Sequence, residues 1–215
     1  MYTRCMHIVN TIDFNKQKHI STLVSLIESY TKITNFSFIH MKPFIPLILG
    51  TSRKDNNSEK IAAYLLDTLT QRGDVEVQLV KPEEFISGRT IPSWEEDAKA
   101  KNWRDLATRA NAFIIITPEY NHGYPGELKM LLDAAYKEYT GKPVVLCGVS
   151  AGPFGGVRVV EQLVQVVREL GMKVLSFSLH FPMVKELTSL SKEDLDKQYA
   201  ERMEKMIDLL LKEIK

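Results

Sequence analysis

Five short apolar stretches, each followed by an amphipathic or polar stretch, constrain this sequence most strongly, because few folds accept that alternation. The apolar stretches read FIPLILG, VEVQLV, AFIIIT, PVVLCGV and KVLSFSL, and they begin at residues 44, 75, 112, 143 and 173. Their length and β-branched content predict strands, and the three that are apolar throughout are typical of strands buried on both faces. The alternation therefore predicts a parallel sheet between two layers of helices.

Helical periodicity occupies the intervals between these strands. The expected helices cover residues 58–72, 96–109, 125–138 and 156–170 and a long C-terminal stretch. The C-terminal helix opens with SKED, which resembles a capping box, and Pro125 suits a first helical turn. Pro46 in the first strand predicts that pairing is incomplete where that strand starts.

The composition is that of a soluble globular protein, with 44% apolar and 26% charged residues. A net charge of +1 gives no reason to expect nucleic acid or an anionic membrane as a partner. Cys5 and Cys147 are far apart, and Cys147 lies in an apolar run, which favours a buried thiol in a reducing compartment. Since no stretch resembles a signal peptide or reaches the roughly 20 apolar residues of a membrane span, we expect a cytoplasmic protein.

Residues 1–40 differ in composition from the rest, because they contain no Gly, Ala or Pro. This N-terminal extension is an added helix around HISTLVSLIESY, a poorly ordered arm, or sequence upstream of a true start at Met41, and the composition change favours the last. Its histidines, His7, His19 and His40, fit no compact metal motif, and no metal site is predicted. Residues 41–215 are expected to form one domain.

Three loops of this domain combine unusual composition with a special position. They cover residues 50–58, 117–125 and 150–156, directly after the first, third and fourth expected strands. In open parallel sheets, ligands bind beyond the carboxyl ends of the strands at the point where strand order reverses. We therefore expect these loops to converge on a ligand.

The first loop, within LGTSRKDNNS, is dense in phosphate-binding groups. The donors are the hydroxyls of Thr51, Ser52 and Ser58, the amide of Asn57 and the guanidinium of Arg53. The helix that begins near Ser58 adds unpaired N–H groups and the positive end of its dipole. The alternative is an ordinary loop in which Ser58 only caps the helix.

The second and third loops have rigid backbones. TPEYNHGYPGELK is rich in turn-forming residues, which can fix N–H and C=O groups against a flat polar ring, although a purely structural turn is the alternative. GVSAGPFGGVR contains four glycines, which allow close approach of a ligand or, for Gly156, simply of a packed helix.

Taken together, LGTSRKDNNS, TPEYNHGYPGELKMLLD and SAGPFGGVR resemble, in order and spacing, the NADPH-dependent FMN reductases. That family has a flavodoxin-like fold and includes quinone, chromate and azo-dye reductases. The resemblance covers residues 44 to about 180 and implies a five-stranded parallel sheet of order 2-1-3-4-5 with helices on both faces. The chain departs from the family pattern in a first loop about two residues longer, which leaves the roles of Asn56 and Asn57 open, and in Met130, which replaces an asparagine.

The resemblance also implies a cofactor site. The FMN phosphate would be held by Thr51, Ser52, Arg53, Asn57 and Ser58, and the isoalloxazine ring would be lined by Pro118, Glu119, Tyr120, Asn121 and Gly123, with Ser150 and Gly152 near its far edge. No catalytic side chain is predicted, because the flavin carries the chemistry. Neither Glu119 nor His122 receives a role from the sequence.

The implied activity is hydride transfer from NADPH, or NADH, through FMN to a small acceptor such as a quinone, free flavin, azo compound or oxidised metal. A homodimer or homotetramer is implied as well. Two alternatives stay open at this point: an FMN electron carrier that does not oxidise NADPH, and a flavin-free scaffold. The acidic surface usual in such carriers is missing here.

Overall fold

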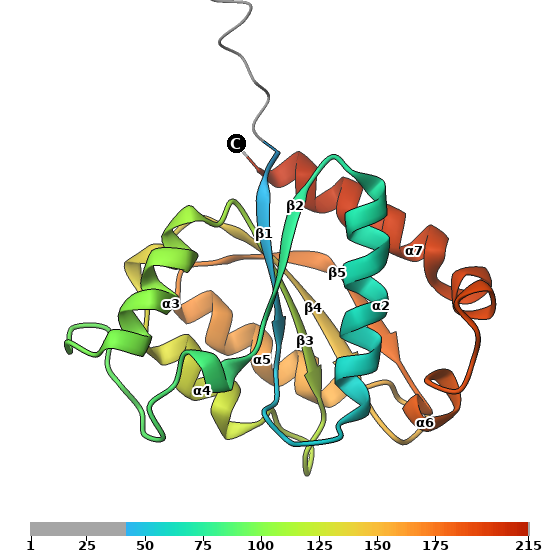
Figure 1. Cartoon of the computed structure of the whole chain (residues 1–215), viewed down its shortest axis with the longest axis horizontal. Helices are drawn as coiled ribbons and strands as arrows, with labels where there is room; N and C mark the ends of the chain where they lie inside the picture. The colour runs from blue at the N-terminus through green and yellow to red at the C-terminus, as the bar shows by residue number, and fades with distance from the viewer. Residues whose placement is uncertain (1–41, 215) are drawn as a thin grey trace, which may run out of the picture. The chain divides into compact units, whose positions relative to one another are not determined.

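A parallel sheet of five strands in the order β2-β1-β3-β4-β5 lies at the centre of the domain (Figure 1). The computed structural model describes residues 42–214, so the N-terminal extension, its candidate helix and its histidines lie outside the described residues. The strands are β1 (Phe44–Leu49), β2 (Glu76–Val80), β3 (Phe113–Pro118), β4 (Pro143–Val149) and β5 (Lys173–Phe181). The predicted flavodoxin-like sheet is confirmed in strand number, direction and order.

Two helical layers cover the sheet, as the alternation of strands and helices requires (Figure 1). One face carries α2 (Asn57–Arg72) and α7 (Lys192–Glu213), and the other carries α3 (Ala98–Arg109), α4 (Gly126–Asp133) and α5 (Val157–Glu169). Successive side chains of a strand point to opposite faces, so β1 sends Ile45 and Leu47 into the first layer and Ile48 into the second. Short elements complete the chain, namely the 3₁₀ turns η2 (Pro82–Glu84) and η3 (Lys137–Tyr139) and the helix α6 (Val184–Leu187).

The start of β1 is paired on one side only, which confirms the expectation from Pro46. Strand β1 pairs with β2 from Phe44 onward but with β3 only from Leu47. Ahead of that point Asn111 takes the place of a strand partner: its side chain accepts from the Phe44 N–H at 2.8 Å, and its own N–H donates to the Phe44 carbonyl at 2.8 Å.

Helix α4 ends at Asp133, so the helix predicted over residues 125–138 is too long. The reason is Tyr139, which is fully buried and reaches the core through η3. Its hydroxyl accepts from the indole N–H of Trp103 at 2.8 Å and donates to the Leu132 carbonyl at 3.1 Å. The tryptophans, which the sequence did not distinguish, differ sharply, since Trp103 is 0% exposed and Trp94 84%.

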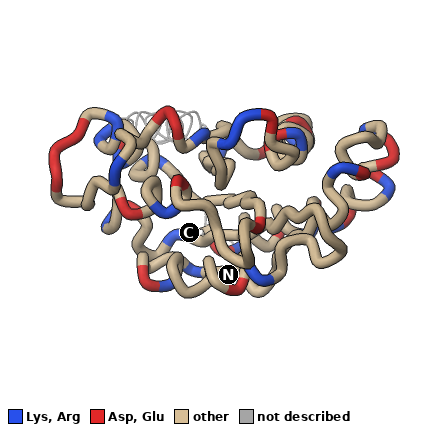
Figure 2. The backbone as a smooth tube through the Cα atoms, turned by 90° about the horizontal axis from the view of Figure 1, so that it is seen from below, with Lys and Arg blue, Asp and Glu red and all other residues tan. Residues whose placement is uncertain are grey.

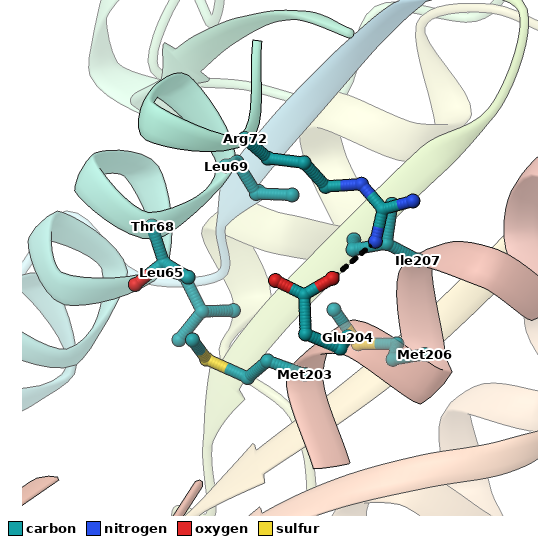
Figure 3. Close-up of a pocket in the computed structure, with 8 residues that line it drawn as sticks. All are labelled: Leu65, Thr68, Leu69, Arg72, Met203, Glu204, Met206 and Ile207. Atoms are coloured by element: carbon teal, nitrogen blue, oxygen red, sulfur yellow. Dashed lines mark hydrogen bonds and ion pairs between the residues drawn. The ribbon is translucent and has the colours of Figure 1, made fainter. Parts of the chain in front are cut away.

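Helices α2 and α7 pack through Leu65, Leu69 and Ile207, and the contact is closed at one end by Arg72 (Figure 3). The guanidinium of Arg72 binds Asp74 at 2.9 Å, Asp208 at 2.6 Å and Glu204. The cavity left between the helices measures about 10 Å³, room for about one water molecule. This pocket therefore belongs to the packing of the domain.

Cys147 is fully buried in β4, as the sequence predicted, and burial raises the pKa of its thiol to about 12. Helix α7 begins as its capping motif predicted, because Ser191 accepts from the Asp194 N–H. Within residues 42–214, no helix has both the length and the apolar character needed to cross a bilayer.

Gly148 provides a test of how tightly the backbone packs at the end of β4. A Cβ atom at this position would lie 2.5 Å from the Gly155 carbonyl oxygen and 2.7 Å from that of Gly156, so Gly148→Ala must push the third loop away from the strand. We expect the free energy of unfolding to fall by about 1–3 kcal/mol, measured by urea unfolding followed by circular dichroism.

Gly126→Ala is the matched control, because nothing lies within 4 Å of a Cβ atom at that position. Its free energy of unfolding should stay within about 0.5 kcal/mol of wild type. Equal stability of the two variants would contradict the close backbone contact.

Candidate flavin-binding site

An open cleft of about 290 Å³ lies at the carboxyl ends of the strands. The three predicted loops all contribute to it, and Val184 of α6 adds a fourth segment. The lining residues are Arg53, Asp55, Asn56, Asn57, Ser58, Pro118, Glu119, Tyr120, Val149, Ser150, Ala151 and Val184. Figure 2 views the molecule from this edge, where basic and acidic residues are interspersed. The expected convergence of the three loops is confirmed.

The first loop leaves β1 at Gly50, and it enters α2 through Asn56. The Asn56 side chain accepts from the Glu59 N–H at 2.7 Å and donates to the Arg53 carbonyl at 2.7 Å. Asn56 is thus the helix cap, and the alternative in which Ser58 caps the helix is wrong. With Glu59 capped, the first-turn N–H groups of Asn57 and Ser58 still lack an intrahelical partner.

Arg53 and Tyr120 join the first loop to the second. The Arg53 guanidinium carbon lies 4.3 Å from the centre of the Tyr120 ring, which is a cation–π contact. The Tyr120 hydroxyl lies 3.0 Å from Thr51 Oγ1. Two segments 69 residues apart in sequence are therefore fixed side by side in the cleft wall.

Thr51 and Ser52 were predicted to bind the phosphate together with other residues of the first loop, but neither of them lines the cleft. Thr51 is fully buried. Thr51 Oγ1 donates to Glu127 Oε1 at 3.0 Å, and the Ser52 N–H donates to the same oxygen at 2.9 Å. The Thr51 hydroxyl and the Ser52 N–H therefore bind Glu127 inside the protein.

Glu127, in the first turn of α4, contacts the first loop and was not predicted from the sequence. Burial alone would raise the pKa of its carboxyl, but the hydrogen bonds that it accepts and the charge of Arg53 hold that pKa below its usual value. The side chain is therefore a carboxylate at neutral pH. Nothing in its sequence position signals this role, since an acidic residue in a first helical turn is common.

Asn121 and Gly123 shape the second loop rather than line the cleft. Tyr120 and Gly123 exchange two backbone hydrogen bonds, each of 2.9 Å, around a two-residue tip. Asn121 and His122 form that tip with left-handed φ values of 51° and 68°, as in a type I′ turn. His122 is thus exposed at the tip of a tight turn, and the turn presents Tyr120 to the cleft.

Glu119 lines the cleft with a nearly buried carboxylate. Its Oε1 lies 3.4 Å from Nη1 of Arg158, which also stacks on Phe154. Its Oε2 is buried and, like Ser52 Oγ, has no hydrogen-bond partner within residues 42–214. Both unpaired atoms belong to loops that form the cleft, and unpaired buried polar groups are rare in folded proteins.

The third loop is held by α6, which the sequence did not predict. The Ser150 hydroxyl donates to the Gly152 carbonyl at 2.9 Å, and the N–H groups of Met183 and Val184 donate to the carbonyls of Gly152 and Ser150. Ser150 and Val184 therefore line the cleft, whereas Gly152 supports the loop behind them.

The lining as a whole suits an amphipathic anion. The first loop supplies a guanidinium, amides and a hydroxyl, together with a helix N-terminus that favours a phosphate. Strands β3 and β4, the third loop and helix α6 supply Pro118, Val149, Ala151 and Val184, which suit a flat ring. Two carboxylates share the lining, but Asp55 is exposed to solvent and Glu119 pairs with Arg158.

Fold and site together define a flavodoxin-like α/β protein with a ligand cleft where the strand order reverses. Residues 44–185 match the family described as NADPH-dependent FMN reductase. Since that match covers more than half of the chain, the protein belongs to this family of FMN-dependent oxidoreductases, which use NAD(P)H as electron donor.

Relatives with sequence similarity carry the corresponding names. An NAD(P)H-dependent FMN reductase of Saccharomyces cerevisiae is 28% identical over 148 residues, which cover 61% of this chain and 76% of the relative. A quinone reductase of Pseudomonas putida is 28% identical over 124 residues, covering 52% of this chain and 62% of the relative. An NADPH azoreductase of a Bacillus species is 28% identical over 119 residues, covering 54% and 64%.

Solved structures agree on the fold. The flavoenzyme FerB of Paracoccus denitrificans, an NAD(P)H:(acceptor) oxidoreductase, superposes with a TM-score of 0.64 at 21% identity, covering 80% of this chain and 97% of that chain. An NADH:FMN oxidoreductase in its apo form gives a TM-score of 0.65 at 20% identity, covering 79% and 89%. At this identity, the likeness concerns the fold alone.

Substitution of the two asparagines at the start of α2 should affect the stability of the protein differently. Asn56→Ala removes the side-chain acceptor of the Glu59 N–H, so the free energy of unfolding should fall by about 1 kcal/mol. Asn57→Ala is the matched control, because this side chain lies in the cleft and caps nothing. Thermal unfolding without ligand measures both, and an equal loss in the two variants would contradict the capping role of Asn56.

Proposed function

We propose that this protein is an NAD(P)H-dependent, FMN-containing oxidoreductase that reduces a small-molecule acceptor, such as a quinone, free flavin, azo compound or oxidised metal. The observation that carries the proposal is the meeting of three loops, distant in sequence, in one cleft with a phosphate-binding helix end and an apolar wall. The names of the similar quinone reductase and azoreductase support the class of acceptor. When bound, FMN supplies the two-electron chemistry between nicotinamide and acceptor.

The phosphate of FMN would be held by the start of α2. Arg53 offers a charged donor, Ser58 a hydroxyl and Asn57 an amide, and the unpaired N–H groups of the first helical turn add the helix dipole. Thr51 and Ser52 support this seat from behind, through their contacts with Glu127. Of the residues predicted to bind the phosphate, some would contact it directly and the others would hold the loop in shape.

The ring of the flavin would lie against the second and third loops. Pro118, Tyr120 and Ser150 line the cleft there, while Asn121, Gly123 and Gly152 fix the backbone behind them. Backbone groups fixed in this way can stabilise charge on a reduced ring without reorganisation. Glu119 is the acidic residue of this wall, and it pairs with Arg158.

The competing functions differ in a measurable way. An electron carrier of this fold would bind FMN without oxidising NADPH, and a scaffold would not bind FMN. An enzymatic function is favoured over both alternatives by the family membership and by the interspersed basic and acidic residues of Figure 2. We further propose a cytoplasmic homodimer or homotetramer, supported by exposed apolar side chains such as Phe154 and Val157 and by the free thiol of Cys147.

The purified protein should be yellow, or become so when FMN is added. We expect flavin absorbance to bleach on anaerobic addition of NADPH and to return when a quinone, an azo dye or free flavin is supplied. Steady-state NADPH consumption with the same acceptors measures turnover. A protein that binds FMN but consumes neither NADPH nor NADH would be a carrier, and one that ignores FMN would be a scaffold.

Arg53→Ala tests the phosphate seat. Loss of a charged donor should raise the dissociation constant of FMN about ten-fold or more, while that of riboflavin, which lacks the phosphate, changes little. Lys54→Ala is the matched control, because Lys54 is the neighbouring cation and does not line the cleft. Quenching of flavin fluorescence measures all four affinities. Equal effects of the two substitutions would show that Arg53 acts only through net charge.

A further inference from the structure

The carboxylate of Glu127 occupies a position beneath the first loop, outside the lining of the cleft. One of its oxygens, Oε1, accepts from the Ser52 N–H at 2.9 Å and from the Thr51 hydroxyl at 3.0 Å. Glu127 is 75 and 76 residues away from these partners in sequence. A helix on one face of the sheet is thereby bonded to the loop that leads to the helix on the other face.

The direction of the hydrogen bonds follows from the charge of Glu127. A carboxylate only accepts, so the single hydroxyl proton of Thr51 points to Glu127. The lone pairs of Thr51 Oγ1 are then free to accept from the Tyr120 hydroxyl at 3.0 Å and from the Arg53 N–H at 3.2 Å. One carboxylate oxygen thus orders the first loop and the aromatic residue of the second.

This arrangement has a consequence for anion binding. The N–H groups of Ser52 and Arg53 are used inside the protein, so they are not available to a ligand in the cleft. The donors of the first loop that line the cleft are the Arg53 guanidinium and the groups at the start of α2. A negative charge close to a phosphate would oppose binding unless its contribution to loop geometry outweighs the repulsion.

We propose that Glu127 is a positioning residue for the FMN phosphate, which holds Thr51 and Ser52 so that Arg53 and the first turn of α2 face the cleft. The inference rests on the proposed function, since it requires FMN to bind in this cleft. It adds a residue to the site and divides the first loop into donors bound to the protein and donors left for the ligand.

The test compares Glu127→Ala with Glu127→Gln. The alanine variant leaves the Ser52 N–H and the Thr51 hydroxyl without their acceptor, so the dissociation constant of FMN should rise about ten-fold or more. The glutamine oxygen can still accept both bonds and carries no charge, so its FMN affinity should stay within about three-fold of wild type or exceed it. Riboflavin affinity, measured by the same fluorescence quenching, should change less than three-fold in both variants.

Glu193→Ala is the matched control, because it removes an acidic residue from the first turn of α7, outside the cleft lining. Its FMN affinity should equal that of wild type. Thermal unfolding without flavin establishes that each variant is folded at the assay temperature.

The outcomes separate cleanly. If wild-type protein does not bind FMN, the proposed function fails; if it binds FMN and Glu127→Ala binds it equally well, only the role of Glu127 fails. A parallel loss of FMN and riboflavin affinity in Glu127→Ala would show general support of the fold and overturn the phosphate-specific role. Failure of Glu127→Gln to recover FMN affinity would overturn the claim that the accepted hydrogen bonds are what matters.

Discussion

Close backbone contact at the carboxyl edge of the sheet is the constraint on which the site depends. Gly50 lies so close to Thr117 that a Cβ atom would come within 2.7 Å of its side chain, and Gly148 has equally little room beside Gly155 and Gly156. Parallel strands end at one edge, but only such tight contacts bring the loops that follow them into one cleft of about 290 Å³. A side chain at Gly50 or Gly148 would push the neighbouring loops apart.

Side-chain hydrogen bonds then fix the walls relative to one another. Two hydrogen bonds connect the second loop, the first loop and helix α4. One joins Tyr120 to Thr51, and the other joins Thr51 to Glu127. A partly buried polar network of this kind stabilises one geometry when its members are paired. The cleft is therefore shaped before any ligand arrives, which lowers the cost of ordering on binding. Asn56 also shapes the cleft in advance. Because it caps α2, the polar groups of Asn57 and Ser58 stay available in the cleft.

The sequence predicted the strands and the convergence of the three loops, because these follow from local patterns and from one general rule about parallel sheets. The strand order was implied by the resemblance to the FMN reductase family, because periodicity does not say which strands are neighbours. It overextended α4, because the burial of Tyr139 against Trp103 is a contact between distant segments that leaves no mark in helical periodicity. It missed α6, a helix of four residues that exists through its bonds to the third loop. The interpretation of the N-terminal extension stays a prediction, because residues 1–40 lie outside the described residues.

By itself, the sequence determined the class of fold and the loops that form the cleft, because apolar periodicity and turn-forming residues act over short distances. Only the tertiary structure decided which residues of those loops line the cleft. Arg53 and Ser58 line the cleft, whereas Thr51, from the same loop, turns inward to Glu127. The physical reason is that a hydroxyl or an N–H points to whichever acceptor the fold brings within 3 Å, and that acceptor came from 76 residues away.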